Sequence, residues 1–357
     1  MYVITVPGVN AAYSQGLRYI CERGELQNSR AGEVLVAPTP VTIVYEKPQE
    51  RVLFDPLRDA NPVFHLMESL WMLAGRNDAR WLDQFVKDFS SRFAEDDGIQ
   101  HGAYGFRWRH HFDMEGGGEW DLPDQLDSVV NMLTKDPESR RAVIQMWDPV
   151  ADLGANKKDL PCNCTIFLRV HINRECVSGQ WKDISVLDMM VCCRSNDLVW
   201  GATGANAVHF SMLLEYLAGR IGVKVGRYTQ CANNMHIYTS ILPKLDKPQN
   251  LAFYPGVRSI GTVWDYWDND LNKFMVWTTL DNPAKADLSY ANVWFKDTAE
   301  PMFYAHWLWR FARKQEALDY LLTPNNMAPD WKKAALEWMQ RRMARSMIAK
   351  GELVHGR

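Results

Sequence analysis

Hydrophobic residues near the N-terminus occur in short runs that are rich in β-branched and aromatic side chains. These runs are YVITV at 2–6, VTIVYE at 41–46 and RVLFD at 51–55, and polar links containing Gly and Pro separate them. The pattern predicts β-strands. The link NSRAGE at 28–33 predicts a mobile surface loop.

Helical spacing of apolar positions follows in four further segments. They lie at 64–71, at 81–85 after the GRNDA break, at about 124–134, and at 207–220, where Gly222 provides a helix-ending residue. Between the helical segments at about 124–134 and 207–220 lie three strand-like runs, RAVIQMW, CTIFLRVHI and SVLDMMVCCRS. A further strand-like segment, containing HIY at 236–238, follows the second of these helices. Together these elements predict the α+β class.

The pattern changes near residue 245, after which the chain carries 8 of its 15 tryptophans. The last predicted helix has an apolar stripe of Leu336, Met339, Met343 and Met347. Its basic residues face elsewhere: Lys332, Lys333, Arg341, Arg342, Arg345 and Lys350. A basic, aromatic segment could bind nucleic acid, but we favour a largely helical extension, 246–357, that packs on a core formed by 1–245.

Composition narrows the class of protein. The 357 residues are 47% hydrophobic, which suffices for a large core, and 40 basic against 43 acidic residues give a formal charge of −3. No overall field attracts nucleic acid or an anionic membrane. No signal segment or run of roughly 18 apolar residues stands out, so we expect a cytoplasmic protein. Seven scattered cysteines predict free thiols rather than disulfides.

Cys162 is the first candidate for chemistry, because DLPCNC places it where a turn enters a strand. A thiol is a nucleophile when positive charge stabilises its thiolate, and Arg140, Arg141 and Arg194 are candidate sources. Most cysteines in a core are inert, so this residue alone decides nothing. A zinc site is set aside, because the neighbours Cys192 and Cys193 would point to opposite faces of a strand.

Two other catalytic patterns are absent. No signature of a papain-like hydrolase surrounds Cys162. GATGAN at 201–206 lacks the lysine and the spacing of a phosphate-binding loop.

A series of motifs becomes specific when taken together. In chain order they are SRAGE with Arg30, HLMESLWMLAG with Glu68, GAYGFRWR with Tyr104, SRRAVIQMW with Arg140 and Arg141, LPCNC with Cys162, CRSND with Arg194, Ser195 and Asp197, GANAVHFSMLL with Asn206, and HIY with His236 and Tyr238. From Arg30 to Tyr238 the chain resembles thymidylate synthase and its relatives, the pyrimidine-nucleotide hydroxymethylases. The resemblance implies a large mixed sheet wrapped by helices, and a homodimer in which two sheets stack back to back.

The resemblance also implies a covalent mechanism in which Cys162 adds to carbon six of dUMP and carbon five becomes a nucleophile. The phosphate would be held by Arg30, Arg194, Ser195 and, across the dimer interface, Arg140 and Arg141 of the partner subunit. Forked guanidinium groups suit a dianion, and their charge would also favour the thiolate.

The remaining implied roles concern the base, the sugar and the one-carbon donor. Asn206 would read the base, where relatives acting on dCMP carry aspartate, and His236 and Tyr238 would bind the sugar hydroxyl. A buried Glu68 would have a raised pKa and exchange protons through water. Tyr104 would help to remove the proton from carbon five, and Asp197 would contact the folate. Methylenetetrahydrofolate is the implied co-substrate, and no metal is expected.

Three departures from the synthases decide which branch we expect. Asn163 replaces the usual histidine after the nucleophile, and Phe89 stands where a tryptophan usually stacks on the folate. The chain runs more than a hundred residues past HIY and ends in GELVHGR, without the usual closing tail. Poorer exclusion of water favours hydration of the methylene intermediate, so we expect a dUMP hydroxymethylase of the kind known from bacteriophages.

Three other functions stay open, and we rank them below dUMP hydroxymethylase. Thymidylate synthase comes next, since the extension could itself form a lid, and dCMP hydroxymethylase is third. A nucleotide-binding relative without turnover, regulating RNA through the last helix, is the alternative from another class of protein.

Overall fold

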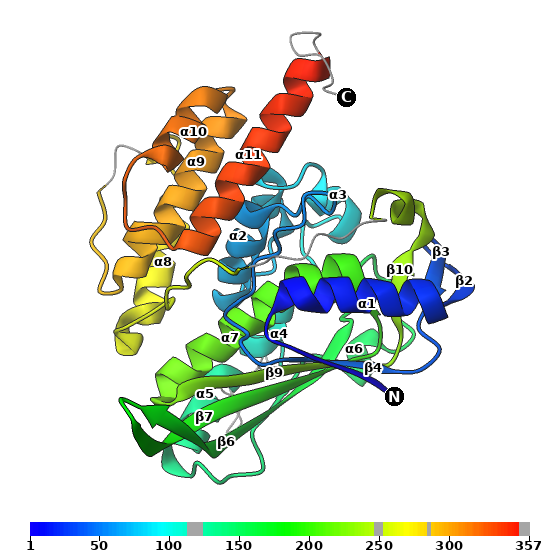
Figure 1. The fold of residues 1–357 in the computed structure, drawn as a ribbon, viewed down its shortest axis with the longest axis vertical. Helices are drawn as coiled ribbons and strands as arrows, with labels where there is room; N and C mark the ends of the chain where they lie inside the picture. The colour runs from blue at the N-terminus through cyan, green and yellow to red at the C-terminus, as the bar shows by residue number, and fades with distance from the viewer. Residues whose placement is uncertain (113–123, 246–252, 284–286, 350–357) are drawn as a thin grey trace.

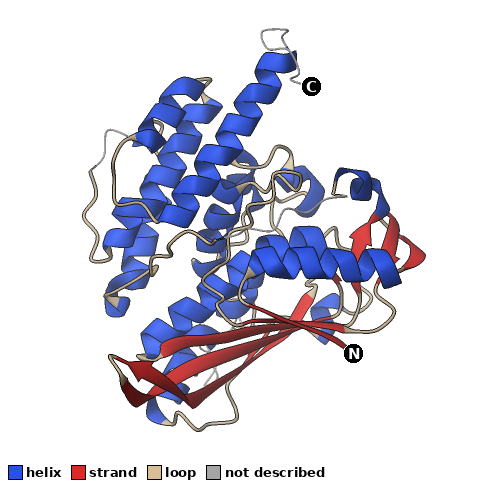
Figure 2. Cartoon of the chain, in the orientation of Figure 1, coloured by secondary structure: helices blue, strands red, loops and turns tan. Residues whose placement is uncertain are grey.

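The computed structural model describes residues 1–112, 124–245, 253–283 and 287–349, and contains two β-sheets with a large set of helices (Figure 1). The larger sheet has six strands in the order β1-β4-β9-β7-β6-β5, and the smaller sheet has four in the order β2-β3-β10-β8. Most helices gather on one side of the larger sheet (Figure 2). The predicted α+β fold, a large mixed sheet flanked by helices, is confirmed.

The strands lie close to the predicted runs. Their bounds are β1 Tyr2–Val6, β2 Glu25–Ser29, β3 Gly32–Val36, β4 Val41–Tyr45, β5 Val143–Gln145, β6 Asn163–Val177, β7 Gln180–Cys193, β8 Asn196–Asp197, β9 Lys224–Ala232 and β10 Met235–Tyr238. Parallel pairs β1–β4 and β7–β9 alternate with antiparallel pairs β4–β9, β6–β7 and β5–β6, which makes the larger sheet mixed.

The structure contains more helices than the sequence pattern predicted. Those before residue 245 are α1 Val9–Arg23, α2 Pro62–Leu73, η1 Ala79–Gln84, α3 Phe89–Phe93, α4 Tyr104–Arg109, α5 Gln125–Lys135, α6 Pro149–Asp152, η2 Leu198–Ala205, α7 Asn206–Ile221 and η3 Thr239–Lys244. Those after it are η4 Trp264–Tyr266, α8 Trp267–Trp277, η6 Phe295–Ala299, α9 Glu300–Arg310, α10 Lys314–Leu322 and α11 Pro329–Ala349.

The two faces of the larger sheet have different surroundings. Helices α1 and α7 pack against one face, where alternate side chains such as Ile43 are fully buried. The opposite face leaves Val3, Val143, Phe167 and Met190 partly exposed on four different strands. Single apolar residues scattered over a surface are ordinary. Several exposed apolar residues on the same face of one sheet are instead typical of a surface that contacts another protein.

Helix α2 is buried on nearly every side. Eleven of its twelve residues are buried, and Phe64 is the half-buried exception. The helix lies between α7 of the core and helices α9 and α11, and Asn61 caps its N-terminus by accepting a hydrogen bond from the backbone N–H of Phe64. A helix that is apolar all round belongs in a core, and α2 carries Glu68 into that core.

Buried contacts connect the helices after residue 253 to the preceding core. Glu215 on α7 accepts hydrogen bonds from the Arg51 guanidinium, the Gln49 amide and the backbone N–H of Ile260. Tyr254 donates to Asp330 over 3.1 Å and accepts from the backbone N–H of Val52. The division of the chain near residue 245 stays a prediction.

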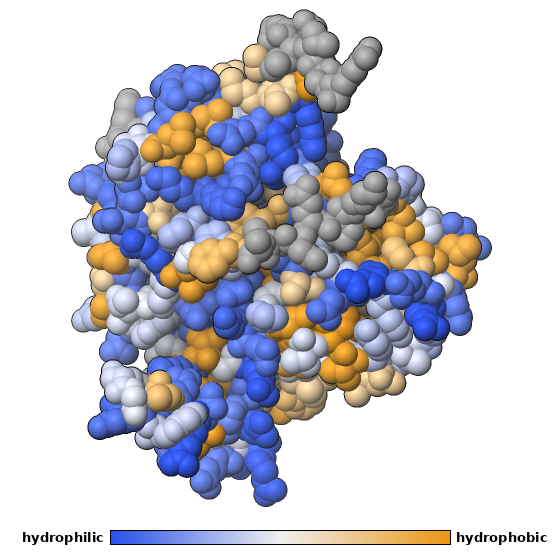
Figure 3. Space-filling view, viewed as in Figure 1, coloured by the Kyte–Doolittle hydropathy of each residue, from blue (hydrophilic) through white to orange (hydrophobic). Residues whose placement is uncertain are grey.

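Hydrophilic side chains predominate along the visible face of α11 (Figure 3). The buried side of this helix is more aromatic than its sequence pattern indicated. Trp331, Trp338 and Met339 are buried, whereas Leu336 and Met343 of the predicted stripe are only half-buried.

Three local predictions need correction. Residues 51–55 form no strand, because Asn10 bonds the backbone of Val52 and Phe54 in place of a neighbouring strand. Residues 28–33 form a tight hairpin between β2 and β3, with only 30–31 outside the strands. The segment around 81–85 is a short 3-10 helix, η1, rather than an α-helix.

Candidate active site

The predicted substrate residues meet where β6, β7 and the smaller sheet approach one another. Cys162 precedes β6, Arg194 follows β7, and the side chains of β10 complete the same wall. They surround a cavity of about 730 Å³. Its lining includes Arg30, Tyr104, Cys162, Arg194, Ser195, Asp197, Asn206, His236 and Tyr238. Nine of the residues expected from the sequence therefore share one cavity.

Cys162 lies deep in this cavity beside a guanidinium group. A terminal nitrogen of Arg194 is 3.5 Å from its Sγ, and the Tyr104 hydroxyl accepts from its backbone N–H over 3.2 Å. Burial raises the pKa of the Cys162 thiol, and the charges of Arg194 and Arg30 lower it. Burial is the larger of the two effects. The cations favour the thiolate form of Cys162, but the pKa of its thiol stays above the ordinary value.

Arg30 and Arg194 converge on the segment that leads to Cys162. Arg194 donates to the carbonyls of Pro161, over 2.9 Å, and Leu160, over 3.2 Å. Arg30, in the β2–β3 turn, reaches the Lys158 carbonyl over 3.5 Å. Arg140 and Arg141 are exposed and do not line the cavity of their own chain.

The residues expected to read the base and the sugar line the smaller cavity. Asn206, at the start of α7, donates to Asn196 Oδ1 over 3.3 Å. His236 Nδ1 pairs with Asn234 Oδ1 at 3.0 Å, and burial lowers the pKa of His236. Its ring stands perpendicular to that of Tyr238 at 5.6 Å.

Asp197 caps the helical segment η2 with one oxygen. Its Oδ1 accepts from the backbone N–H groups of Val199 and Trp200, both over 2.7 Å. Its Oδ2 is buried and has no hydrogen-bond partner among the described residues. Burial raises the pKa of Asp197 to about 6, so this carboxyl can exchange a proton near neutral pH.

A second cavity of about 1430 Å³ adjoins the first. Trp200 lines both cavities, is half exposed, and has the Arg58 guanidinium 4.0 Å above its ring. Phe89 lines the second cavity, where it packs against Phe64 and Phe93. The indole of Trp200, which the motifs did not single out, is therefore the aromatic ring at the junction.

Helices α9 and α11 supply one side of the second cavity. They contribute Trp309, Arg310, Trp338, Arg342 and Arg345 to its lining. Flat aromatic side chains together with guanidinium groups fit a heteroaromatic ligand that ends in carboxylates.

Glu68 lies in the wall of the second cavity and has a partner that the sequence did not reveal. His209 Nε2 is 2.9 Å from Glu68 Oε2, and both side chains are almost fully buried. His209 follows Asn206 by three residues on α7, so helical spacing was the one signal that could have placed it near the site.

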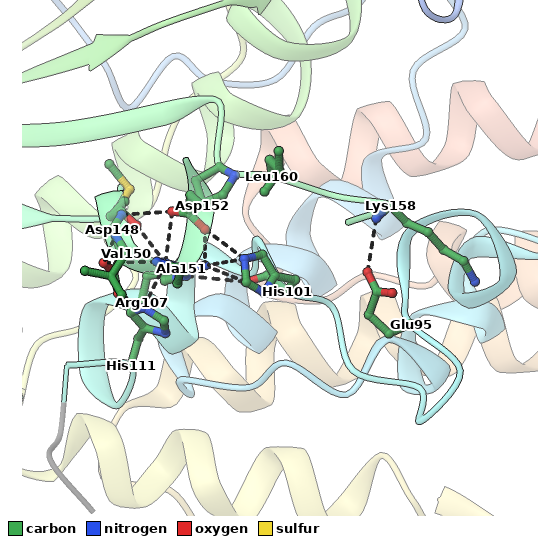
Figure 4. Close-up of polar contacts among 12 residues, drawn as sticks. Glu95, His101, Arg107, His111, Asp148, Val150, Ala151, Asp152, Lys158 and Leu160 are labelled. Carbon is green, nitrogen blue, oxygen red and sulfur yellow. Dashed lines mark hydrogen bonds and ion pairs between the residues drawn. The ribbon is translucent and has the colours of Figure 1, made fainter. Parts of the chain in front are cut away.

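A buried ionic network holds the elements that carry Tyr104 and Cys162 (Figure 4). Asp152, at the end of α6, accepts from Arg107 over 2.8 Å and pairs with His101 at 2.7 Å. Burial acts to raise the pKa of Asp152, but hydrogen bonds from the Asp148 backbone, His101 and Arg107 together outweigh burial and lower the pKa. The network fixes α4 against the segment that leads to Cys162.

Asn163 follows Cys162 but is not among the residues that line the cavity. It is fully buried, and its Oδ1 accepts from the Cys193 thiol over 2.8 Å. This position therefore contributes to the core rather than to the cavity wall.

The cysteines show no disulfide, and no group of three or more metal-ligating side chains occurs among the residues that the structure describes. Within the same residues no helix is both long and apolar enough to cross a bilayer.

The fold and the cavity define an enzyme of the thymidylate synthase class, and comparison with known proteins agrees. The family model described as thymidylate synthase matches residues 11–252, and the chain belongs to this family. The deoxyuridylate hydroxymethyltransferase of Pseudomonas phage M6 is 39% identical, over 96% of this chain and 95% of that protein. This alignment must extend beyond residue 252, where the family model ends.

Two further relatives carry the same name and match about two thirds of this chain. The deoxyuridylate hydroxymethyltransferase of Bacillus phage SP01 is 32% identical over 67% of this chain and 59% of that protein. That of Delftia phage PhiW-14 is 27% identical over 66% of this chain and 62% of that protein.

Proposed function

We propose that this enzyme transfers a one-carbon unit from methylenetetrahydrofolate to carbon five of dUMP, and that water completes the reaction to give 5-hydroxymethyl-dUMP. One observation carries the proposal: a relative named for this activity matches almost the entire chain, extension included. The geometry supports it, because Cys162 faces a cavity with two guanidinium groups and an amide.

The nucleotide would occupy the smaller cavity. Arg30, Arg194 and Ser195 would hold its phosphate, and His236 would hold the sugar hydroxyl through its Nε2. The Asn206 amide would accept the ring N–H and donate to the neighbouring exocyclic oxygen. The guanidinium groups would also stabilise the Cys162 thiolate as it adds to carbon six.

The folate co-substrate would occupy the larger cavity. The residues present fit it, since Trp200, Trp309 and Trp338 suit its flat ring systems and the arginines of α9 and α11 suit its carboxylates. Phe89 would line this site rather than shield the intermediate, and Asp197 would contact the pterin with its unpartnered oxygen. Tyr104 would assist removal of the proton from carbon five.

The second subunit of a homodimer would complete the phosphate site. The uncovered face of the larger sheet offers Val143, Phe167 and Met190 for back-to-back packing. Arg140 and Arg141 lie just before β5, at the edge of the same sheet, and are exposed. In the proposed dimer they would reach the cavity of the other subunit.

A product assay tests the function. Purified enzyme is given dUMP and methylenetetrahydrofolate, and the nucleotide and folate products are identified by mass spectrometry. Hydroxymethyl-dUMP and tetrahydrofolate are expected. Thymidylate with dihydrofolate in equal amount would instead establish the synthase, and turnover of dCMP in preference to dUMP would establish the third alternative.

A second experiment addresses turnover itself. Fluoro-dUMP with the folate should form a covalent adduct at Cys162 that survives denaturation and disappears in Cys162→Ala. Absence of the adduct in the unaltered enzyme would favour a nucleotide-binding protein without catalysis.

A further inference from the structure

The buried pair formed by Glu68 and His209 is unusual in its hydrogen bonding. Their side chains are 8% and 2% exposed, and the nearest atoms are 2.9 Å apart. Yet Glu68 Oε2 and both ring nitrogens of His209 have no hydrogen bond of acceptable geometry among the described residues. Buried polar atoms without partners are costly, so three of them at one place indicate that a further polar molecule completes the site.

The position of the pair connects it with both cavities. Glu68 lines the larger cavity, and Asn206, one helical turn before His209, lines the smaller one. Burial raises the pKa of Asp159, which lines the smaller cavity, and the negative charge of Glu68 adds to this rise. The pair is therefore connected to the larger cavity through Glu68 and to the smaller cavity through Asn206 on the same helix as His209.

Other charged and titratable groups around His209 come from three elements. Helix α2 contributes Glu68 and His65, and the segment before it contributes Arg58. Burial, Arg58 and His209 together hold the pKa of His65 well below its ordinary range, so His65 stays neutral. On the side of α4, Tyr104 lies next to Phe210, and burial raises its pKa well above the ordinary value.

We propose that His209 is a positioning residue that, through Glu68, orients the water that adds to the methylene intermediate and shares the proton that this water loses. The proposal rests on the proposed function and deepens it. The 2.9 Å contact allows the carboxylate and the imidazole to share one proton, so the pair offers an acceptor for the proton that the water loses and a fixed position for its oxygen. His209 is the side chain that pairs with Glu68 in this way.

The step balances without an added oxidant or reductant. The oxygen of water bonds to the exocyclic methylene carbon, and the proton of water passes to the Glu68–His209 pair. The electrons of the exocyclic double bond move into the ring as an enolate. Its collapse restores the double bond between carbons five and six and releases Cys162 as a thiolate.

The test separates hydration from the earlier steps with His209→Gln, which keeps a donor near Glu68 but cannot titrate. We expect hydroxymethylation to fall about 100-fold, the usual size of a general acid–base contribution. Formation of the fluoro-dUMP adduct needs no hydration and should persist. A small thiol added to the assay should capture more of the intermediate as a thioether, because hydration is slowed while the intermediate still forms.

Matched variants control for damage to α7. Ser211→Ala alters a neighbouring buried side chain that donates to the Val208 carbonyl within its own helix, and it should keep the hydroxymethyl-to-thioether ratio of the unaltered enzyme. His209→Asn provides a second non-titrating side chain if the glutamine variant does not fold. An unchanged hydroxymethyl-to-thioether ratio in the variant that folds, or loss of the adduct together with turnover, would overturn the role of His209. A synthase product from the unaltered enzyme would instead refute the proposed function itself.

Discussion

The contact between Asp59 and α11 offers a direct test of how the C-terminal helices are attached. The Asp59 carboxylate is 9% exposed and lies 3.1 Å from Arg341 Nε, 3.1 Å from Arg342 Nε and 2.6 Å from Arg345 Nη1. Asp59 itself has a positive φ of 47°, a conformation that asparagine also tolerates. Asp59→Asn therefore removes the charge and leaves the backbone conformation accessible.

The expected loss follows from the exposure of the arginines. They are 25%, 47% and 56% exposed, so each pair should contribute about 0.2–1 kcal/mol rather than the larger value of a buried pair. Together they should contribute about 1–2 kcal/mol to the free energy of unfolding. Salt should shrink the difference, because solvent reaches the guanidinium groups.

Urea unfolding of the full chain at low and high salt measures this loss, and amide hydrogen exchange localises it. Exchange should accelerate most in 329–349. Asp281→Asn is the control, because Asp281 is exposed and forms no ion pair among the described residues. If Asp59→Asn unfolds within about 0.5 kcal/mol of the unaltered chain, as a surface change would, or exchange rises equally everywhere, the electrostatic attachment of α11 is refuted.

Three further changes test other parts of the molecule. Asn206→Asp should shift the kcat/KM preference from dUMP toward dCMP, and an unchanged preference would remove Asn206 from base recognition. Asp197 has a folded pKa of about 6 against an ordinary 3.8, so the folded state binds the extra proton and loses stability as pH rises between these values. Asp197→Asn should reduce the loss measured between pH 4 and pH 8 by at most about 3 kcal/mol, while Asp330, whose pKa burial also raises to about 6, keeps its own contribution; a loss of unchanged size in the variant would show that Asp197 does not contribute. Gly219→Ala would place a methyl group 2.0 Å from the Trp264 ring and should destabilise the chain by about 1–3 kcal/mol, whereas Gly256→Ala, 3.8 Å from Pro329, should unfold like the unaltered chain in the same assay.

The sequence predicted the strands and helices whose apolar period is clear, and its motifs predicted a set of residues that share one cavity. It failed at 51–55, because side chains from distant parts of the chain bond that backbone, and no local pattern encodes such partners. It also missed His209 and Trp200. A buried histidine in an apolar helix has no local mark of function, and the position of Trp200 between two cavities depends on the packing of η2.

The burial of α2 has a consequence for how this chain can be divided. The helix packs against α9 and α11 as well as against α7, and eleven of its twelve residues are buried. Removing the helices after residue 253 from this chain would therefore expose apolar side chains of α2 to water. The residues before 245 should accordingly be unstable or prone to aggregate when produced without the helices that follow them.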